Sequence, residues 1–308
     1  MPDFPIVDTH VHLWDPKRLH YAWIKGKPLF ERPYYIEDYA RDLGELQVEA
    51  MVFLECYADF DAERGQYLEE VKFVEEEAKR DPRLMAIVPM APLEKGKRAE
   101  PILAEMAANH PTVRGIRRIV EFDADPRALT LSAGFIEGVR LLETFGYHFE
   151  INVNFTQMDI VRDFVRHIAH VPMILDHCGK PGIAKGAIAQ YRSDIKELAR
   201  HPNLWIKLSD LPVEADHAAW TEADLRPYID ATIEAFGIER VIYAGDYPVC
   251  LQATTLPRWV ATLDRALAGV PRADLRKFYR DNANAFYRLG LPEDAHAASP
   301  PASARNRS

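Results

Sequence analysis

The chain has 308 residues, enough for two domains of about 150 residues or for one barrel domain of about 250. Hydrophobic residues make up 48% of the chain and charged residues 28%, which supplies a core and excludes the disordered, collagen-like and coiled-coil classes. The formal net charge of −9 argues against a nucleic-acid or anionic membrane partner. Three cysteines are too few for a disulfide framework or a four-cysteine zinc site, which indicates a reducing compartment.

The beginning of the chain carries no targeting signal. Residues 1–5 lack the basic and long apolar regions of a signal peptide. No uninterrupted apolar run approaches the roughly 18 residues of a membrane-spanning helix. We therefore expect a cytoplasmic protein without a membrane partner, and the sequence leaves a homo-oligomer open.

Short aliphatic and β-branched runs recur along the chain, and each is followed by a polar turn and a stretch with helical spacing. The eight expected strands are Ile6–Leu13, Ala50–Tyr57, Leu84–Pro89, Val113–Val120, His148–Asn154, Pro172–Cys178, Leu204–Ser209 and Val241–Asp246. This alternation predicts an α/β fold over residues 1–291, either one closed (β/α)₈ barrel or a doubly wound open sheet. The long aromatic connection at 14–49 is expected to shape a pocket, and the Pro-, Ala- and Ser-rich tail at 292–308 is expected to be disordered.

Helical spacing follows most of the expected strands. It is found at Gln66–Arg80, Ala99–Asn109, Gly134–Phe145, Asp159–His167, Ala187–Arg200, Asp224–Phe236, Leu256–Ala268 and Ala273–Asp281. The glutamates of the first of these segments are expected to form a solvated face.

Polar residues at the carboxyl ends of the strands are the main functional signal, because parallel barrels build their active sites there. In the first strand, the period-two alternation places Asp8, His10 and His12 on one face. The two imidazoles suit either one metal ion or the polarisation of a carbonyl group, and the alternative is a pair of structural histidines. His177 ends the sixth strand as a candidate base or ligand, with a rim-capping role as the alternative. Asp246 ends the eighth strand as a candidate general acid and base, with a helix cap as the alternative.

Four motifs, in this order, resemble the amidohydrolase superfamily. They are Asp8-x-His10-x-His12, Leu175-Asp176-His177-x-Gly179-Lys180-Pro181, Lys207-Leu208-Ser209 and Gly245-Asp246-Tyr247-Pro248-Val249-Cys250. Within the superfamily they are similar to the amidohydrolase 2 branch, which includes sugar-lactone hydrolases of the L-fuconolactonase and L-rhamnonolactonase type. The resemblance implies a distorted (β/α)₈ barrel that hydrolyses a cyclic ester. Asp246 would manage the proton of the attacking water, with His10, His12 and His177 beside it.

The resemblance breaks down at the metal ligands of the metal-rich members. These proteins carry a histidine on the fifth strand and often a lysine on the fourth, whereas this chain has Glu150 to Asn154 and Arg117 with Arg118 there. A binuclear site is therefore not expected. At most one divalent metal is implied, zinc if present, with His10 and His12 as its expected ligands. Some members of the branch work without a metal, so the resemblance also leaves a metal-free site open.

Residues that contact the substrate are less well defined by the sequence. Alternation places Glu150, Asn152 and Asn154 toward the barrel axis. Arg117 at the fourth strand suits a ring oxygen or a carboxylate, unless it is a rim ion-pair partner. The further candidates for substrate binding are Asn154, Glu55, Lys207 and Trp23, the last of which could instead only bury the first loop.

These residues predict a hydrolase that opens a small-molecule lactone, most simply a sugar aldonolactone. Lactone hydrolysis needs a base for water and a polarised carbonyl but no protein nucleophile. The chain contains no Gly-x-Ser-x-Gly and neither of the glycine-rich phosphate-binding motifs. Two alternatives stay open at this point. One is a hydrolase of a carboxylated lactone from aromatic degradation, which would need several arginines at the mouth. The other is a catalytically silent barrel that binds a sugar acid.

Overall fold

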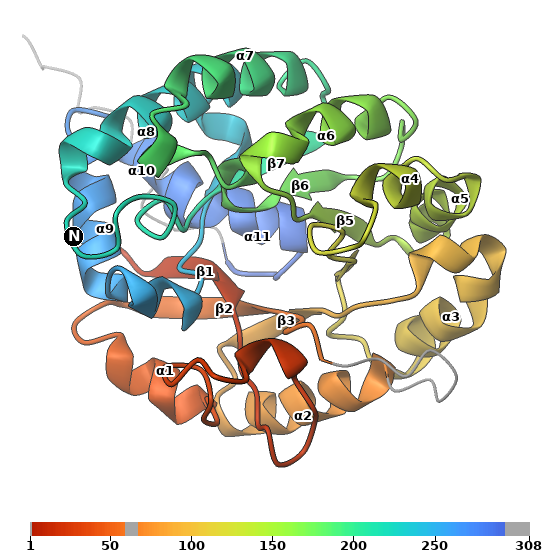
Figure 1. The fold of residues 1–308 in the computed structure, drawn as a ribbon. Coiled ribbons are helices and arrows are strands. Elements are labelled where there is room, and N and C mark those ends of the chain that lie inside the picture. Colours follow the sequence, from red (N-terminus) through yellow and green to blue (C-terminus); the bar gives the residue numbers. More distant parts are fainter. Residues whose placement is uncertain (1, 59–66, 293–308) are drawn as a thin grey trace, which may run out of the picture.

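The computed structural model of this chain describes residues 2–58 and 67–292. Eight parallel strands form a ring, and helices surround it (Figure 1). The strands are β1 (Ile6–Val11), β2 (Val48–Leu54), β3 (Leu84–Val88), β4 (Gly115–Arg117), β5 (His148–Ile151), β6 (Met173–Leu175), β7 (Leu204–Leu208) and β8 (Val241–Tyr243). Their aliphatic runs are buried on both faces, as is usual for parallel sheets covered by helices.

The ring consists of two regular sheets joined at two weak seams. One sheet has the order β1-β2-β3 and the other β4-β5-β6-β7-β8. At one seam a parallel bridge joins Ile87 to Val113, and at the other a parallel bridge joins Val11 to Tyr247. The backbone amide of His12 donates to the carbonyl of Tyr247 at 2.7 Å across the second seam. The arrangement is the predicted distorted (β/α)₈ barrel, and the doubly wound open sheet is not found.

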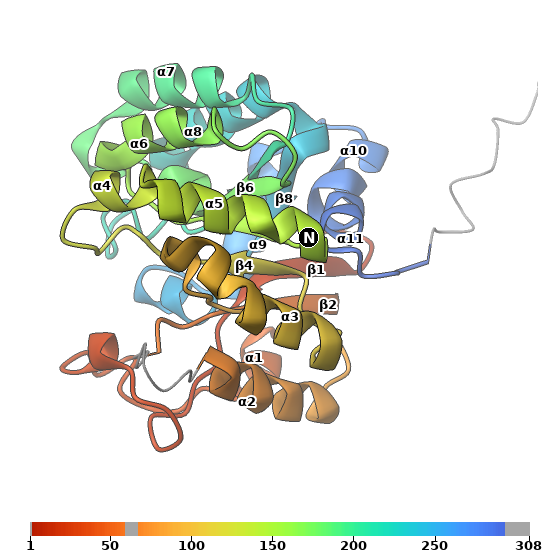
Figure 2. The same cartoon turned by 90° about the vertical axis from the view of Figure 1, so that its right-hand side faces the viewer.

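The helices lie outside the strands, and Figure 2 shows α2 and α7 on opposite sides of the barrel. Their bounds are α1 (Ile36–Asp42), α2 (Tyr67–Arg80), α3 (Glu100–Asn109), α4 (Pro126–Thr130), α5 (Ala133–Leu141), α6 (Met158–Val165), α7 (Ile188–Leu198), α8 (Glu222–Phe236), α9 (Leu256–Ala266), α10 (Arg272–Arg276) and α11 (Asn282–Tyr287). Side-chain caps fix several beginnings: Ser132 accepts from the amide of Phe135, and Thr255 from that of Arg258. The predicted helix Ala273–Asp281 is interrupted, because a wider π turn follows α10.

Most of the predicted strands extend too far at their carboxyl ends. The prediction placed His12, Asn154, His177 and Asp246 inside strands, whereas all four follow the last paired residue. The backbone ladder ends before these residues. The side chains of His12, His177 and Asp246 lie at the open end of the barrel, and Asn154 caps the helix that follows.

Side chains of α11 fill the barrel interior from the end opposite to the carboxyl ends of the strands. Val7, Val52 and Ile242 belong to an interior cluster that also includes Ala283 and Tyr287 of α11. In Figure 1, α11 lies across the middle of the ring. The helix thus closes one end of the barrel and leaves the carboxyl ends of the strands as the accessible end.

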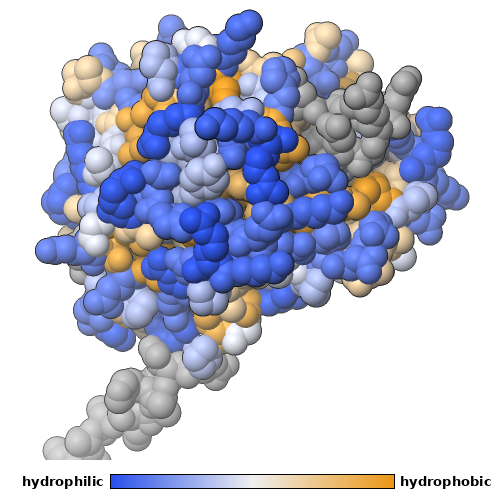
Figure 3. Space-filling model, turned by 90° about the horizontal axis from the view of Figure 1, so that it is seen from below, coloured by the Kyte–Doolittle hydropathy of each residue, from blue (hydrophilic) through white to orange (hydrophobic). Residues whose placement is uncertain are grey.

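The molecular surface is mostly hydrophilic where Figure 3 shows it, with apolar side chains scattered among polar ones. Within residues 2–58 and 67–292, no helix combines the length and apolar character needed to cross a membrane. Of the tail predicted at 292–308, residues 293–308 lie outside the described residues.

Two glutamates of α2 do not lie on the predicted solvated face. Glu70 and Glu77 are buried, and each accepts a hydrogen bond from a backbone amide of another segment: Glu70 from Cys56 at 3.1 Å, and Glu77 from Ile36 at 2.8 Å. The prediction was wrong for these two glutamates. Helical spacing alone does not show which carboxylates accept a hydrogen bond from a backbone amide of another segment. Burial, followed by the charge of Glu55, raises the pKa of Glu70 from 4.5 to about 8.

The raised pKa of Glu70 predicts a stability change with pH. Its folded-state pKa lies above the unfolded value, so its contribution is complete below about pH 4.5 and is lost as the pH rises through about 8. Glu70→Gln should therefore stabilise the protein by at least about 2 kcal/mol at pH 8 and by much less at pH 5. Urea unfolding at both pH values measures this. Glu69→Gln, at an exposed neighbour, is the control, and an equal effect of Glu70→Gln at both pH values would contradict the prediction.

Candidate active site

A cavity of about 580 Å³ opens at the carboxyl ends of the strands. Its lining residues come from the first long connection and from the segments after β2, β4, β5, β6, β7 and β8. They are His12, Ala22, Trp23, Lys27, Phe30, Glu55, Cys56, Tyr57, Arg117, Ile119, Phe122, Asn152, His177, Lys180, Asp210, Asp246, Val249 and Gln252. The connection at 14–49 thus contributes to the pocket, as predicted.

The alternation predicted for the first strand fails at Asp8. Its carboxylate accepts hydrogen bonds from the amides of Gly245 at 2.7 Å and His10 at 3.1 Å and from the hydroxyl of Tyr39 at 2.9 Å. The pairing of β1 with β2 shifts register between Asp8 and Val11, so a strict period of two no longer holds there. Asp8 therefore fastens β1 to the segment after β8 and does not line the cavity. A Cβ atom at Gly245 would lie 2.3 Å from this carboxylate, so only glycine fits.

His12 and Asp246 line the cavity, and the fully buried His10 lies directly beside them. The Nε2 atoms of the two histidines are 3.1 Å apart. Asp246 Oδ1 lies 3.5 Å from His10 Nε2 and 3.4 Å from His12 Nε2. The Nδ1 atom of His12 lies 2.9 Å from the carbonyl oxygen of Leu54, which can only accept a hydrogen bond. Neutral His12 therefore carries its proton on Nδ1 and presents the Nε2 lone pair to the cavity.

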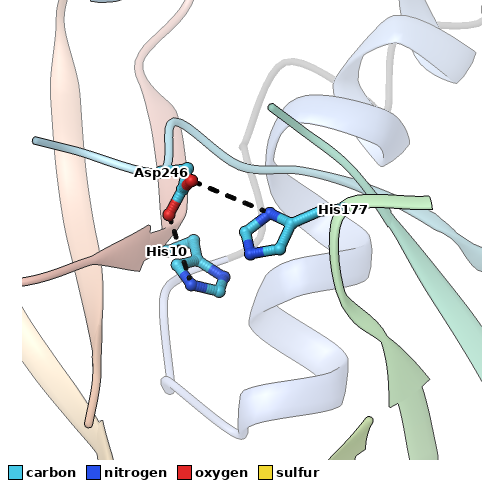
Figure 4. A group of neighbouring side chains, drawn as sticks. All are labelled: His10, His177 and Asp246. Carbon is cyan, nitrogen blue, oxygen red and sulfur yellow. Dashed lines mark ion pairs between the residues drawn. The ribbon is translucent and has the colours of Figure 1, made fainter. Parts of the chain in front are cut away.

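His177 lies on the other side of the same carboxylate (Figure 4). Its Nδ1 atom is 4.0 Å from Asp246 Oδ2 and 2.9 Å from the hydroxyl of Ser209. The hydroxyl orients the imidazole ring. The structure thus brings together all four predicted catalytic residues, which come from the ends of three strands.

Burial sets the charges in this cluster. It lowers the pKa of His177 to about 3, although the charge of Asp246 acts in the opposite direction. Burial and the Lys207 ammonium group hold the pKa of His10 well below its ordinary value. Burial also opposes ionisation of Asp246, but His177 and His12 outweigh it and lower the pKa of the carboxyl group. At neutral pH the site therefore contains neutral imidazoles at His10 and His177 and a carboxylate at Asp246.

Left-handed backbone geometry is concentrated at the mouth. Among the residues that the structure describes, seven other than glycine have a positive φ, and six of them follow β2, β6, β7 or β8. These six are Tyr57, His177, Cys178, Lys180, Asp210 and Asp246. The left-handed turns reverse the chain directly after each strand and leave His177, Asp210 and Asp246 facing the cavity.

Three predicted substrate contacts belong to a buried ionic network beneath the cavity. Arg117 donates from Nε to Glu55 at 2.7 Å and from Nη1 to Asp176 at 3.2 Å. Lys207 is fully buried and pairs with Glu150 and, at 3.1 Å, with Asp176. Arg117 and Glu55 also line the cavity, whereas Lys207 does not.

The other two predicted contacts have separate locations. Asn154 begins the turn before α6: its side-chain oxygen accepts from the amide of Thr156 at 3.0 Å, and it is not among the residues that line the cavity. Trp23 lines the cavity and donates from Nε1 to the carbonyl of Cys56 at 2.7 Å. It therefore helps to bury the first connection and forms part of the cavity wall, while its predicted contact with a substrate stays a prediction.

Asp210 lines the cavity but is absent from the predicted site. It follows β7 by two residues, the same offset by which His177 follows β6. Burial, followed by the charge of Asp246, raises its pKa well above the ordinary range of a carboxyl group. The strand-end position was the signal that could have identified it, because it directly follows Lys207-Leu208-Ser209.

The donor set at the bottom of the cavity fits one divalent ion. In tetrahedral zinc sites, bonds of about 2.1 Å place the ligand atoms about 3.3 Å apart. The Nε2 atoms of His10 and His12 and Oδ1 of Asp246 are separated by 3.1, 3.4 and 3.5 Å. Asp246 Oδ1 is buried without a hydrogen-bond partner. Arg117 Nη1, 3.1 Å from His10 Nε2, competes with an ion for the same lone pair.

Known proteins are similar to this chain over most of its length. It is 32% identical over 302 residues to an L-fucono-1,5-lactonase of Burkholderia multivorans, covering 94% of this chain and 98% of the relative. It is 24% identical over 341 residues to an L-rhamnono-gamma-lactonase of Scheffersomyces stipitis, covering 94% and 100%.

A crystal structure of an amidohydrolase from Burkholderia multivorans with bound zinc superimposes with a TM-score of 0.82 at 28% identity, covering 94% of this chain and all of that one. The family described as amidohydrolase matches residues 7–289, from the first strand through α11. Because this match contains the whole barrel and the cluster at its mouth, the chain belongs to the amidohydrolase family.

Proposed function

We propose that this protein hydrolyses a lactone, and that the substrate is a sugar aldonolactone. The observation that carries the proposal is the Asp246 carboxylate, buried among His10, His12 and His177 at the bottom of a cavity large enough for a monosaccharide ring. A carboxylate that is ionised at neutral pH and surrounded by imidazoles suits proton transfer from water. The lactonase names of two relatives support the same reaction class.

The reaction needs a single proton carrier. Asp246 accepts a proton from water as the water oxygen bonds to the lactone carbonyl carbon. The carbon–oxygen bond of the ring then breaks, and Asp246 returns the proton to the departing ring oxygen. The product is a hydroxy acid, and the carboxylate is regenerated in its starting state.

The histidines and Arg117 prepare the carbonyl group. His177 lines the cavity and can direct a ring N–H group at the developing oxyanion. His12 also lines the cavity and offers its Nε2 lone pair there. If an ion is bound, His10, His12 and Asp246 would hold it, and it would acidify water and polarise the carbonyl. Arg117, Glu55 and Trp23 line the cavity and are proposed substrate contacts. We propose that Lys207 and Asn154 act by positioning other residues, because neither lines the cavity.

The charge of the cavity favours an uncharged lactone over a dicarboxylate. Among the described residues, the cations that line it are Lys27, Lys180 and Arg117. Arg117 is paired with Glu55 and Asp176, and Lys180 with Glu121. The neighbouring Arg118 pairs with Glu94 and Asp123 and does not line the cavity. Two carboxylates of a substrate would therefore face mostly neutralised cations.

A substrate screen tests the proposed reaction directly. Each turnover releases an acid, so a weakly buffered pH indicator reports hydrolysis for any lactone. We expect activity on aldonolactones to exceed that on carboxylated lactones. A preference for carboxylated lactones, or no turnover of either class, would contradict the proposal.

Replacing Asp246 tests the proton carrier. Asp246→Asn keeps the shape of the side chain but removes the proton acceptor, so kcat should fall by about 10² or more. Steady-state kinetics with the metal content measured on the same samples separates loss of the base from loss of an ion. Asp230→Asn, at a surface position of α8, is the control. Wild-type kcat in folded Asp246→Asn protein would rule out the assignment.

Metal content provides a test that does not depend on activity. We expect at most one zinc ion per chain, because β5 supplies no further histidine to this cluster. Elemental analysis after dialysis should show it lost from the double variant His10→Ala, His12→Ala and retained in His217→Ala, which changes an exposed histidine. Two tightly held ions per chain, or retention in the double variant, would refute this site.

A further inference from the structure

Two buried polar atoms in the cavity have no role in the reaction described above. Asn152 Oδ1 and Asp210 Oδ1 are buried without a hydrogen-bond partner in the part of the chain that the structure describes. Each side chain lines the cavity, although each residue is only 4% exposed. An unpaired buried acceptor is unfavourable, so a ligand that donates a hydrogen bond to it is favoured by about tenfold or more over one that does not.

The two residues flank the catalytic cluster. Asn152 follows β5, His177 follows β6 and Asp210 follows β7, and these three strands are neighbours in one sheet. Asp210 has a left-handed backbone with a φ of 60°, which turns the chain immediately after β7. A ring held over His177 and Asp246 therefore lies between an acceptor on each side.

Both atoms favour a ligand that donates hydrogen bonds. An amide oxygen and a carboxyl oxygen accept hydrogen bonds, which hydroxyl groups donate and ether, carbonyl or carboxylate oxygens do not. Asp246 also acts on the carboxyl group of Asp210, but Asp210 Oδ1 has no hydrogen-bond partner among the described residues and can accept one from a ligand. That oxygen accepts whether the group is charged or neutral.

Other parts of the cavity lining are apolar and offer no hydrogen-bond acceptor. Trp23, Phe30, Ile119, Phe122 and Val249 contribute to them. The large apolar side chains that are exposed in the described residues, Leu29 and Phe122, also lie in or beside this apolar lining. A ring with an apolar face and a hydroxylated edge matches both kinds of lining.

We propose that Asp210 and Asn152 are specificity-determining residues that accept hydrogen bonds from two ring hydroxyl groups of the lactone. The inference rests on the proposed lactonase function and adds to it the selection of hydroxylated over deoxygenated rings. A site built to receive a hydroxyl group rejects the analogue that lacks it, because the buried acceptor is left unpaired.

The test compares one aldonolactone with its single-deoxy analogues. In wild-type protein, removal of a recognised hydroxyl group should lower kcat/KM by about tenfold or more. In Asp210→Ala the ratio between the parent and one deoxy analogue should fall to about one, and in Asn152→Ala the ratio at a different ring position should do the same. Asp210→Asn retains an acceptor and tolerates the left-handed backbone, so it should keep most of the discrimination. Asp216→Ala, at an exposed position of the same connection, is the matched control.

A binding measurement keeps the inference separate from turnover. A 1,5-anhydroalditol has the hydroxylated ring but no carbonyl group, and calorimetry gives its affinity and that of its deoxy analogues. Selective binding without turnover would support the inference and contradict the proposed function. Turnover with wild-type discrimination in folded Asp210→Ala and Asn152→Ala would overturn the inference alone. If an alanine variant does not fold, wild-type protein that binds parent and deoxy rings equally would also overturn it.

Discussion

The cost of removing charge from water is the constraint on which the catalytic end of this barrel depends. Lys207 and Arg117 are cations with almost no exposure, and the carboxylates around them are Glu55, Glu150 and Asp176. Breaking a buried pair of this kind leaves an uncompensated charge and is strongly destabilising. Since the partners come from β2 and from β4 to β7, the network fixes several strands relative to one another. The histidines rest on this ionic layer, and Arg117 approaches His10 from within it.

The same layer determines the chemistry above it. Burial alone would raise the pKa of Glu150, but Lys207 and His148 hold it well below its ordinary value. For Asp176 burial prevails and raises the pKa to about 7, so the two carboxyl groups beside Lys207 differ in charge behaviour. Burial and Lys207 together hold the pKa of His10 well below its ordinary value, and a neutral imidazole retains the lone pair that a metal ion or a proton requires. In the proposed reaction, Lys207 would thus act through His10, since Lys207 does not line the cavity.

The sequence predicted the barrel and the meeting of His10, His12, His177 and Asp246, because both follow from the rule that parallel strands end together. It could not predict the location of Asp8, since alternation holds only where the ladder is regular and β1 shifts register there. The depth of Lys207 and the capping by Asn154 depend on partners that only the folded chain supplies. The strand-end rule applies to Asp210 as well, but no motif of its own marks this residue in the sequence, so the predicted site does not include it.

The left-handed residues at the mouth also bear on attempts to make this protein more heat-resistant. An L-residue in this conformation costs on the order of 1–3 kcal/mol, and here the cost is concentrated after β2, β6, β7 and β8. Glycine would relieve it, but at His177, Asp210 or Asp246 the gain would remove a side chain that faces the cavity. Selection for thermal tolerance alone would therefore favour proteins that lack these cavity side chains. Arg288, which has a φ of 55° beyond α11, is the comparable position away from the mouth, where such selection could proceed without conflict with turnover.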